Sequence, residues 1–158
     1  MGWHYVQLKH FLSDSFRLHY VIVEVPSVQR VGENYFRTNK EIRYAQAIES
    51  CDVLLLSNVL QYIEDWVQFV TGFRHVGVKN VVLSKSYAYD GEPLVTNNII
   101  MGRARPMHIF NEAELIAVFE KSGYRLMRRW LEDRPIRGVL SGRYLNIPQS
   151  PEMLFSAI

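Results

Sequence analysis

The chain has 158 residues, of which 48% are hydrophobic and 22% charged, and its formal net charge is +2. This composition is typical of a single globular domain and argues against a disordered chain or a strongly basic nucleic-acid-binding protein. Cys51 is the single cysteine, which excludes an internal disulfide and favours a cytoplasmic location. No segment approaches the roughly 20 apolar residues of a membrane-spanning helix, so no membrane partner is expected.

Helical and strand patterns alternate along the first half of the chain. The spacing of apolar residues predicts a helix over 3–12, and β-branched and aromatic residues predict a strand over 18–25. Ser27 is expected to cap the next helix, over 27–37. The elements predicted next are a short strand over 42–46, a fully apolar strand over 51–60 and an amphipathic helix over 62–76.

The second half begins with a strand predicted over 80–88. Residues 90–111 are rich in Gly, Pro and Asn, and an irregular excursion is expected there. A helix is predicted over 111–123, with Asn111 as its N-cap and Glu114 three residues later, as in a capping box. Gly123 can end this helix, so the sequence carries local signals for both of its ends.

The order of these elements predicts an α/β fold. Two final strands, over 124–133 and 138–147, are expected to be antiparallel neighbours because only a short connection separates them. Alternating strands and helices predict a Rossmann-like open sheet, mostly parallel, with helices on both faces and an antiparallel C-terminal strand pair. One domain is predicted over 1–147, followed by a loose tail over 148–158.

Polar side chains follow several of the predicted strands. In open α/β sheets, ligands bind outside the carboxyl ends of the strands. Glu24 lies at such an end, about 20 positions after Gly2, which is the arrangement of a carboxylate that binds a ribose. A carboxylate that faces water or caps the following helix is the alternative interpretation. The other polar residues at strand ends are Gln46, Ser57, Asn58 and the stretch 84–87.

Four stretches of the sequence, in their order and spacing, resemble a known family. They are GWHYVQLKHFL, VIVEVPSVQRVGENYF, CDVLLLSNVLQYIEDW and RPMHIFNEAELIAVFEKSGYRL. Together they resemble the class I S-adenosylmethionine-dependent methyltransferases, most closely a bacterial subgroup whose substrates are unassigned. The resemblance covers nearly the whole chain. It implies transfer of a methyl group from S-adenosylmethionine to an unknown small-molecule acceptor.

The resemblance also implies roles for particular residues. Glu24 would bind the ribose hydroxyls of the cofactor, Val25 would flank its adenine, and Gln46 would lie near the adenine after the next strand. The remaining cofactor-binding residues would be Gly2 and Tyr5 in the glycine-rich loop and, after the apolar strand, Ser57, Asn58 and Gln61.

The start of the chain departs from the family's pattern. That pattern begins with a strand and a glycine-rich loop, whereas this sequence begins at Met1 and Gly2, inside the loop. The first, central strand is therefore expected to be missing. The strands that carry Glu24 and Asn58 would then pair with each other or leave open edges. Open edges invite association, so a homo-oligomer formed by sheet completion is a further expectation.

His108 is the candidate general base, because a hydroxyl or amine acceptor must lose a proton. An ordinary, partly buried imidazole is the alternative for this residue. Tyr87 and Asn97 are candidates for polar contacts with the acceptor, and the histidine spacings do not indicate a metal site. Two other functions stay open. One is a catalytically inactive methyltransferase-like fragment that acts as an interaction or oligomerisation module, and the other is a Rossmann-like domain that binds another adenine nucleotide.

Overall fold

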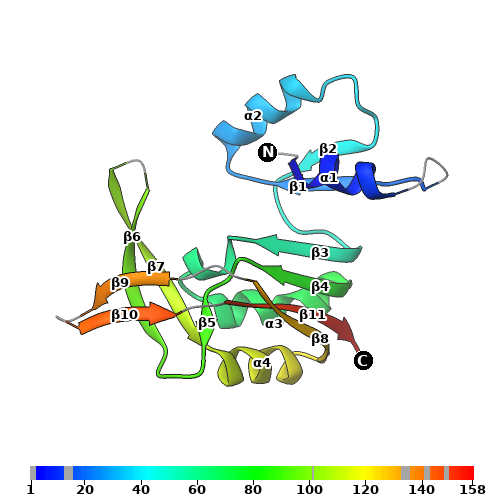
Figure 1. Cartoon of the computed structure of the whole chain (residues 1–158). Helices are drawn as coiled ribbons and strands as arrows, with labels where there is room; N and C mark the ends of the chain where they lie inside the picture. The colour runs from blue at the N-terminus through cyan, green and yellow to red at the C-terminus, as the bar shows by residue number, and fades with distance from the viewer. Residues whose placement is uncertain (1–2, 13–15, 101, 133–135, 141–142, 148–149) are drawn as a thin grey trace. The chain divides into compact units, whose positions relative to one another are not determined.

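A computed structural model describes residues 3–12, 16–100, 102–132, 136–140, 143–147 and 150–158 (Figure 1). The chain separates into two compact units, which are unit 1 over residues 1–48 and unit 2 over residues 49–158. The single domain over 1–147 stays a prediction. None of the helices in the described residues has the length and apolar character needed to cross a membrane.

The described residues of unit 1 form two helices and two parallel strands. In chain order they are α1 (Trp3–Phe11), β1 (Tyr20–Val23), α2 (Pro26–Tyr35) and β2 (Ile42–Ala45). The two strands pair in parallel, with Val23 opposite Ala45. Tyr5, Ile22 and Ile42 form the core of this unit. The predicted order of helix, strand, helix and strand is confirmed here, with boundaries shifted by one or two residues.

The start of α2 differs from the prediction. Val25 is the N-cap, and it makes no side-chain capping bond, so Ser27 as the cap is wrong. Pro26 stands at the first helical position, where its fixed φ suits a helix and its missing N–H costs nothing. The proline therefore starts the helix one residue early and places Ser27 inside the first turn.

Gly32 of α2 is in close contact with Tyr44 of β2. A Cβ on Gly32 would collide with the Tyr44 hydroxyl and ring. Overpacking of this kind costs about 1–3 kcal/mol, against a gain of about 1 kcal/mol from the better helix propensity of alanine. We therefore expect Gly32→Ala to lower the free energy of unfolding of unit 1, measured by urea denaturation followed by circular dichroism.

Gly72 in α3 (Trp66–Val76) offers a matched control for this substitution. A Cβ added there meets no atom within 4 Å. Gly72→Ala should therefore stabilise the protein by about 0.5–1 kcal/mol. Equal stabilisation by both substitutions would contradict the close packing of Gly32 against Tyr44.

Unit 2 is built on a four-stranded mixed sheet in the order β3–β4–β11–β8. β3 and β4 are parallel, whereas β11 runs antiparallel to both of its neighbours. α3 packs against β4, and α4 packs against β8 and α3. The predicted α/β class, with parallel strands, antiparallel C-terminal pairing and helices, is confirmed. The elements of this layer are β3 (Cys51–Ser57), β4 (Val78–Ser84), β8 (Tyr124–Glu132), β11 (Ser150–Ala157) and α4 (Glu112–Lys121).

The C-terminal strand pair is made by other residues than predicted. β8 pairs with β11, whereas β9 (Ile136–Leu140) and β10 (Arg143–Ile147) pair with each other. The expected loose tail is therefore wrong, because residues 150–157 form an inner strand. Met153 and Phe155 on this strand are fully buried, and that burial holds the segment in the sheet.

The stretch expected to be irregular also contains strands. β6 (Leu94–Ile100) and β7 (Arg103–Asn111) pair as an antiparallel hairpin, and the short β5 (Ala88–Tyr89) runs parallel to β7. Met107 and Ile109 are buried at the base of this hairpin. The partly buried side chains that pack on them are Tyr62, Tyr87, Tyr89 and Leu94. This second core explains why a segment rich in turn-forming residues is ordered.

Side-chain caps fix the helix starts in unit 2. Asp65 accepts a hydrogen bond from the Gln68 amide, so α3 begins at Trp66, after the short 3₁₀ turn η1 (Leu60–Tyr62) and later than predicted. Asn111 accepts a bond from the Glu114 amide at 2.8 Å, which confirms it as the cap of α4.

Candidate functional site

Polar residues gather at the carboxyl edge of the small sheet in unit 1. Because β1 and β2 are parallel and in register, Glu24 and Gln46 follow their strands at the same edge. Glu24 is half-buried, and Gln46 Nε2 donates a hydrogen bond to Gln29 Oε1 at 3.1 Å. Gln29 is buried in the first turn of α2. Gln29 lies six residues after the end of β1, inside α2, so no strand-end signal in the sequence marks it.

Tyr44 adds a second polar group near Glu24. Burial raises the pKa of Tyr44, and the Glu24 and Glu33 carboxylates raise this pKa further. The Tyr44 hydroxyl is buried and has no hydrogen-bond partner among the described residues. Buried hydroxyls without partners are rare, so this hydroxyl, which lies against Gly32 of α2, is an unusual feature of the unit.

Other predicted residues of unit 1 lie elsewhere. The hydroxyl of Tyr5 donates to Glu41 Oε2 at 2.7 Å and accepts a bond from Asn39 Nδ2 at 3.0 Å. This bond from Tyr5 holds the pKa of Glu41 below its ordinary value. Glu41 precedes β2, whereas Glu24 follows β1, so the structure does not bring the Tyr5 hydroxyl to the carboxyl edge. Val25 is exposed beside Glu24, and Gly2 lies outside the described residues.

In unit 2, two neighbouring strands end in unusual backbone conformations. β3 and β4 end at Ser57 and Ser84, which are opposite each other. The next residue in each case, Asn58 and Lys85, has a φ of 58°. Residues other than glycine seldom adopt this left-handed backbone conformation, and it persists only where the surrounding structure enforces it. Such residues cluster at functional sites, which makes these two strand ends candidates.

Gln61 links these two strand ends from below the surface. Its side chain is fully buried, and Nε2 donates to Asn58 Oδ1 at 2.6 Å and to the Lys85 carbonyl at 3.2 Å. The Ser86 hydroxyl donates to Gln61 Oε1 at 3.5 Å. The structure thus brings Asn58 and Gln61 together beside Ser57. Because Gln61 has no exposed surface, its geometry suits holding Asn58 and Lys85 in place.

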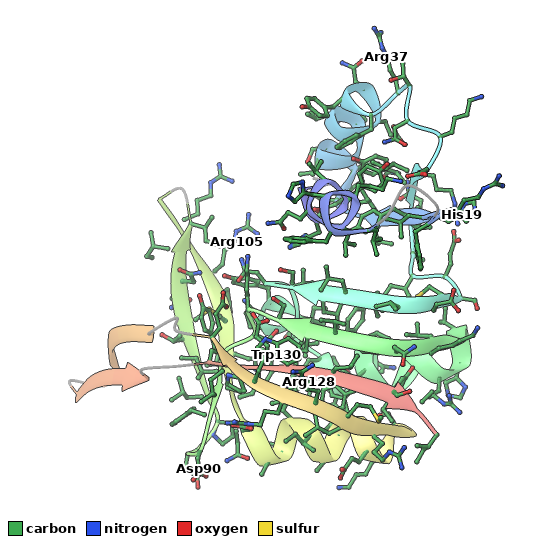
Figure 2. The ribbon with its side chains drawn as sticks, turned by 45° about the vertical axis from the view of Figure 1, so that its right-hand side comes forward. His19, Arg37, Asp90, Arg105, Arg128 and Trp130 are labelled. Atoms are coloured by element: carbon green, nitrogen blue, oxygen red, sulfur yellow. The ribbon has the colours of Figure 1, made fainter. Side chains whose placement is uncertain are left out.

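A row of polar side chains continues from Ser84 across the sheet. The hydroxyl of Ser84 donates to Glu152 Oε1 at 2.9 Å, and Trp130 Nε1 donates to Glu152 Oε2 at 3.1 Å. Figure 2 shows Trp130 and Arg128 on β8. Sequence reasoning missed Glu152 because it lies in the segment expected to be loose. Only the pairing of β11 with β4 and β8 reveals it.

The residues proposed for the acceptor belong to the hairpin and its base. His108 on β7 is half-buried, and its ring stacks parallel to that of Phe110 with 5.8 Å between centroids. Asn97 on β6 is exposed and lies opposite Pro106, one pair further along the same face of the hairpin. Tyr87 packs against the hairpin base. The general-base role of His108 stays a prediction.

Comparison with known proteins gives the fold but no sequence family. No protein-family model matches the chain, and no curated protein matches it in sequence. A Listeria monocytogenes protein described as a putative S-adenosylmethionine-dependent methyltransferase aligns with a TM-score of 0.69 and 11% identity. That alignment covers 99% of this chain and 86% of the other. The chain shares the Rossmann-like α/β fold of that protein.

Two further structures share this fold. LepI in complex with S-adenosylmethionine aligns with a TM-score of 0.62 and 10% identity, over 99% of this chain and 40% of LepI. The second is the 1,6-didemethyltoxoflavin-N1-methyltransferase of Burkholderia thailandensis, solved with bound 1,6-didemethyltoxoflavin and S-adenosylhomocysteine. It aligns with a TM-score of 0.56 and 15% identity. The alignment covers 95% of this chain and 65% of that enzyme.

Among the described residues, no group of three or more His, Cys, Asp or Glu side chains is arranged to hold a metal ion.

Proposed function

We propose that this chain is an S-adenosylmethionine-dependent methyltransferase that acts on a small-molecule acceptor. The observation that carries the proposal is the likeness of fold to proteins solved with this cofactor or its product. LepI is solved with S-adenosylmethionine and the Burkholderia thailandensis enzyme with S-adenosylhomocysteine, and this chain aligns over 99% and 95% of its length with them.

The residues at the carboxyl edge of unit 1 fit the adenosine part of the cofactor. A half-buried carboxylate such as Glu24 accepts hydrogen bonds from two ribose hydroxyls, which offsets the cost of removing it from water. Gln46 supplies amide groups near this carboxylate, and Tyr44 supplies a hydroxyl that has no partner among the described residues. The exposed Val25 provides an apolar surface for one face of an adenine ring.

The reaction itself asks little of the side chains. S-adenosylmethionine, when bound, supplies a methyl group on a positively charged sulfur. The protein must align the acceptor with that methyl group and exclude water. Asn58 and Ser57, at the carboxyl end of β3, are the candidates for contacts with the cofactor and the acceptor. His108 is the candidate that takes a proton from a hydroxyl or amine acceptor.

A calorimetric titration of the full chain with S-adenosylhomocysteine tests this function. We expect micromolar binding. We expect Glu24→Ala to weaken binding by about 1.5–3 kcal/mol, because each bond to a charged group contributes on this scale. Glu120→Ala on α4 is the control, since it removes the same charge from an exposed position that has no part in the candidate site. Its affinity should stay within about twofold of the native chain.

The titration also separates the alternatives. Preference for another adenine nucleotide over S-adenosylhomocysteine would favour a different Rossmann-like binding function. A folded chain that binds neither ligand would favour an inactive, methyltransferase-like interaction module. Equal affinity of the Glu24→Ala variant and the native chain would remove Glu24 from the site while leaving the function intact.

A further inference from the structure

β6 forms an open edge of the three-stranded sheet in unit 2. The order of this sheet is β5–β7–β6, and β7 is the only strand recorded beside β6 among the described residues. Its sequence, LVTNNII, contains no charge and no proline. Charges and prolines are the common means by which proteins keep edge strands from pairing with other chains, and β6 has neither. Figure 1 shows the far end of the hairpin standing clear of the four-stranded sheet.

The pattern of residues along β6 is symmetric about Asn97. Thr96 and Asn98 are polar on either side of it, and the next two positions in both directions are apolar. Val95 and Ile99 share a face with Asn97, because side chains alternate along a strand. They are 58% and 66% exposed. Exposed β-branched side chains at matching distances from a central polar residue suit pairing with an identical strand.

The other face of β6 is held against its own unit. Asn98 Nδ2 donates to the Tyr62 hydroxyl at 2.7 Å, and Leu94 packs on the core of the hairpin base. The strand is therefore fixed in an extended conformation before any partner arrives. A pre-formed strand loses less conformational entropy on association than a flexible segment does.

We propose that β6 pairs with β6 of a second copy of this chain, antiparallel, with a two-fold axis beside Asn97. In this register Val95 lies opposite Ile99 of the partner subunit, and Ile99 lies opposite Val95 of the partner subunit. The outer residues Leu94 and Ile100 are matched in the same way. The two sheets join into one sheet of six strands, with the same surface used on both copies.

The neighbouring registers do not give this match. A register centred on Thr96 puts Val95 opposite Asn97 of the partner subunit. A register centred on Asn98 puts Ile99 opposite Asn97 of the partner subunit. Each of these registers sets an apolar side chain against a polar one on the exposed face. The arginines opposite β6 are Arg105 and Arg103, which lie on β7, one strand away from the new edge (Figure 2 labels Arg105). No like charges therefore come opposite each other in the pair centred on Asn97.

A contact made by one strand pair is small, so the dimer should be weak and dependent on concentration. Sedimentation velocity over a wide range of concentrations of the full chain should show a monomer–dimer equilibrium. Ile99→Lys should lower the association constant about tenfold or more, because it puts a lysine opposite Val95 at two symmetric places. Val67→Lys on α3 is the control, since Val67 is 42% exposed in the same unit.

Either of two results would overturn the proposal. One is a chain that stays monomeric at every concentration. The other is a dimer whose association constant is the same in the Ile99→Lys variant as in the Val67→Lys variant. The second result would indicate association through a different surface. Circular dichroism of each variant checks that the loss of association is not a loss of folding. The outcome does not depend on whether the chain binds S-adenosylmethionine.

Cysteine substitution tests the register, in a background where Cys51→Ser removes the native thiol. Residues directly opposite in an antiparallel pair are about 4.5–5.5 Å apart at Cα, which a disulfide can span. Asn97→Cys should therefore form a covalent dimer on mild oxidation. Val95→Cys alone should stay monomeric, whereas its mixture with Ile99→Cys should cross-link. Cross-linking of Val95→Cys alone, with none by Asn97→Cys, would overturn the register.

Discussion

Replacement of Phe155 by alanine is expected to lower the free energy of unfolding by about 3–5 kcal/mol. Phe155 is fully buried on β11, and its ring stacks on that of Phe119 in α4 with 4.1 Å between centroids. β11 pairs with β4 on one side and with β8 on the other. The lost side chain would therefore leave a cavity between the middle of the sheet and a helix. Urea denaturation followed by circular dichroism measures the change.

A control for this prediction lies three residues further along the chain. Ile158 is 72% exposed, so Ile158→Ala should change the free energy of unfolding by no more than about 0.5 kcal/mol. If residues 150–157 were a loose tail, the two substitutions would have equally small effects. That result would contradict the inner position of β11.

Helices were predictable because their signals are local. The cap of α4 can be identified from Asn111 and the residues that follow it, since the capping bond spans three positions. The boundaries failed where a second local signal competed with the first. Pro26 started α2 before Ser27, and Asp65 started α3 after the predicted position.

Strand pairing was harder to predict because it joins distant parts of the sequence. β11 lies next to β4, and the hydrogen bond between Ser84 and Glu152 spans 68 positions. No pattern within a few residues contains that information. The polar centre of β6, with Asn97 and Asn98, also hides its strand character, because asparagine is rare in strands. Pairing with β7 and packing on the hairpin base override this preference.

The residues of the candidate site also fall into two groups, those that local sequence could identify and those that only long-range packing revealed. Glu24, Gln46 and Asn58 could be predicted because each follows a strand, and a residue that follows a strand can be identified from sequence. Tyr44 and Gln29 emerged only from packing within unit 1, and Glu152 only from the sheet. The buried position of Gln61 was not predictable either. The sequence places Gln61 near a strand end but does not show that its side chain is buried beneath that end.

Gln61→Leu is expected to cost about 2–4 kcal/mol of stability. Leucine fills a similar volume, so the substitution chiefly removes the amide. The Lys85 carbonyl and the Ser86 hydroxyl then each lose a hydrogen-bond partner, and such a loss costs about 1–3 kcal/mol for a buried group. Gln68→Leu on α3 is the control, because Gln68 is exposed and its change should stay within about 0.5 kcal/mol. Equal effects of the two substitutions in urea denaturation would contradict the bridging role.

Gln61→Glu tests the donor function of the same amide through pH. A carboxylate at this position faces Asn58 Oδ1 and the Lys85 carbonyl, which are both acceptors, so the folded state favours the protonated acid. The pKa of the introduced acid should therefore be raised in the folded state above its unfolded value of about 4.3. The loss of stability relative to the native chain should be smallest below that pH and should grow as pH rises through the folded pKa. A loss that does not depend on pH would show that the two strand ends do not need a donor at residue 61.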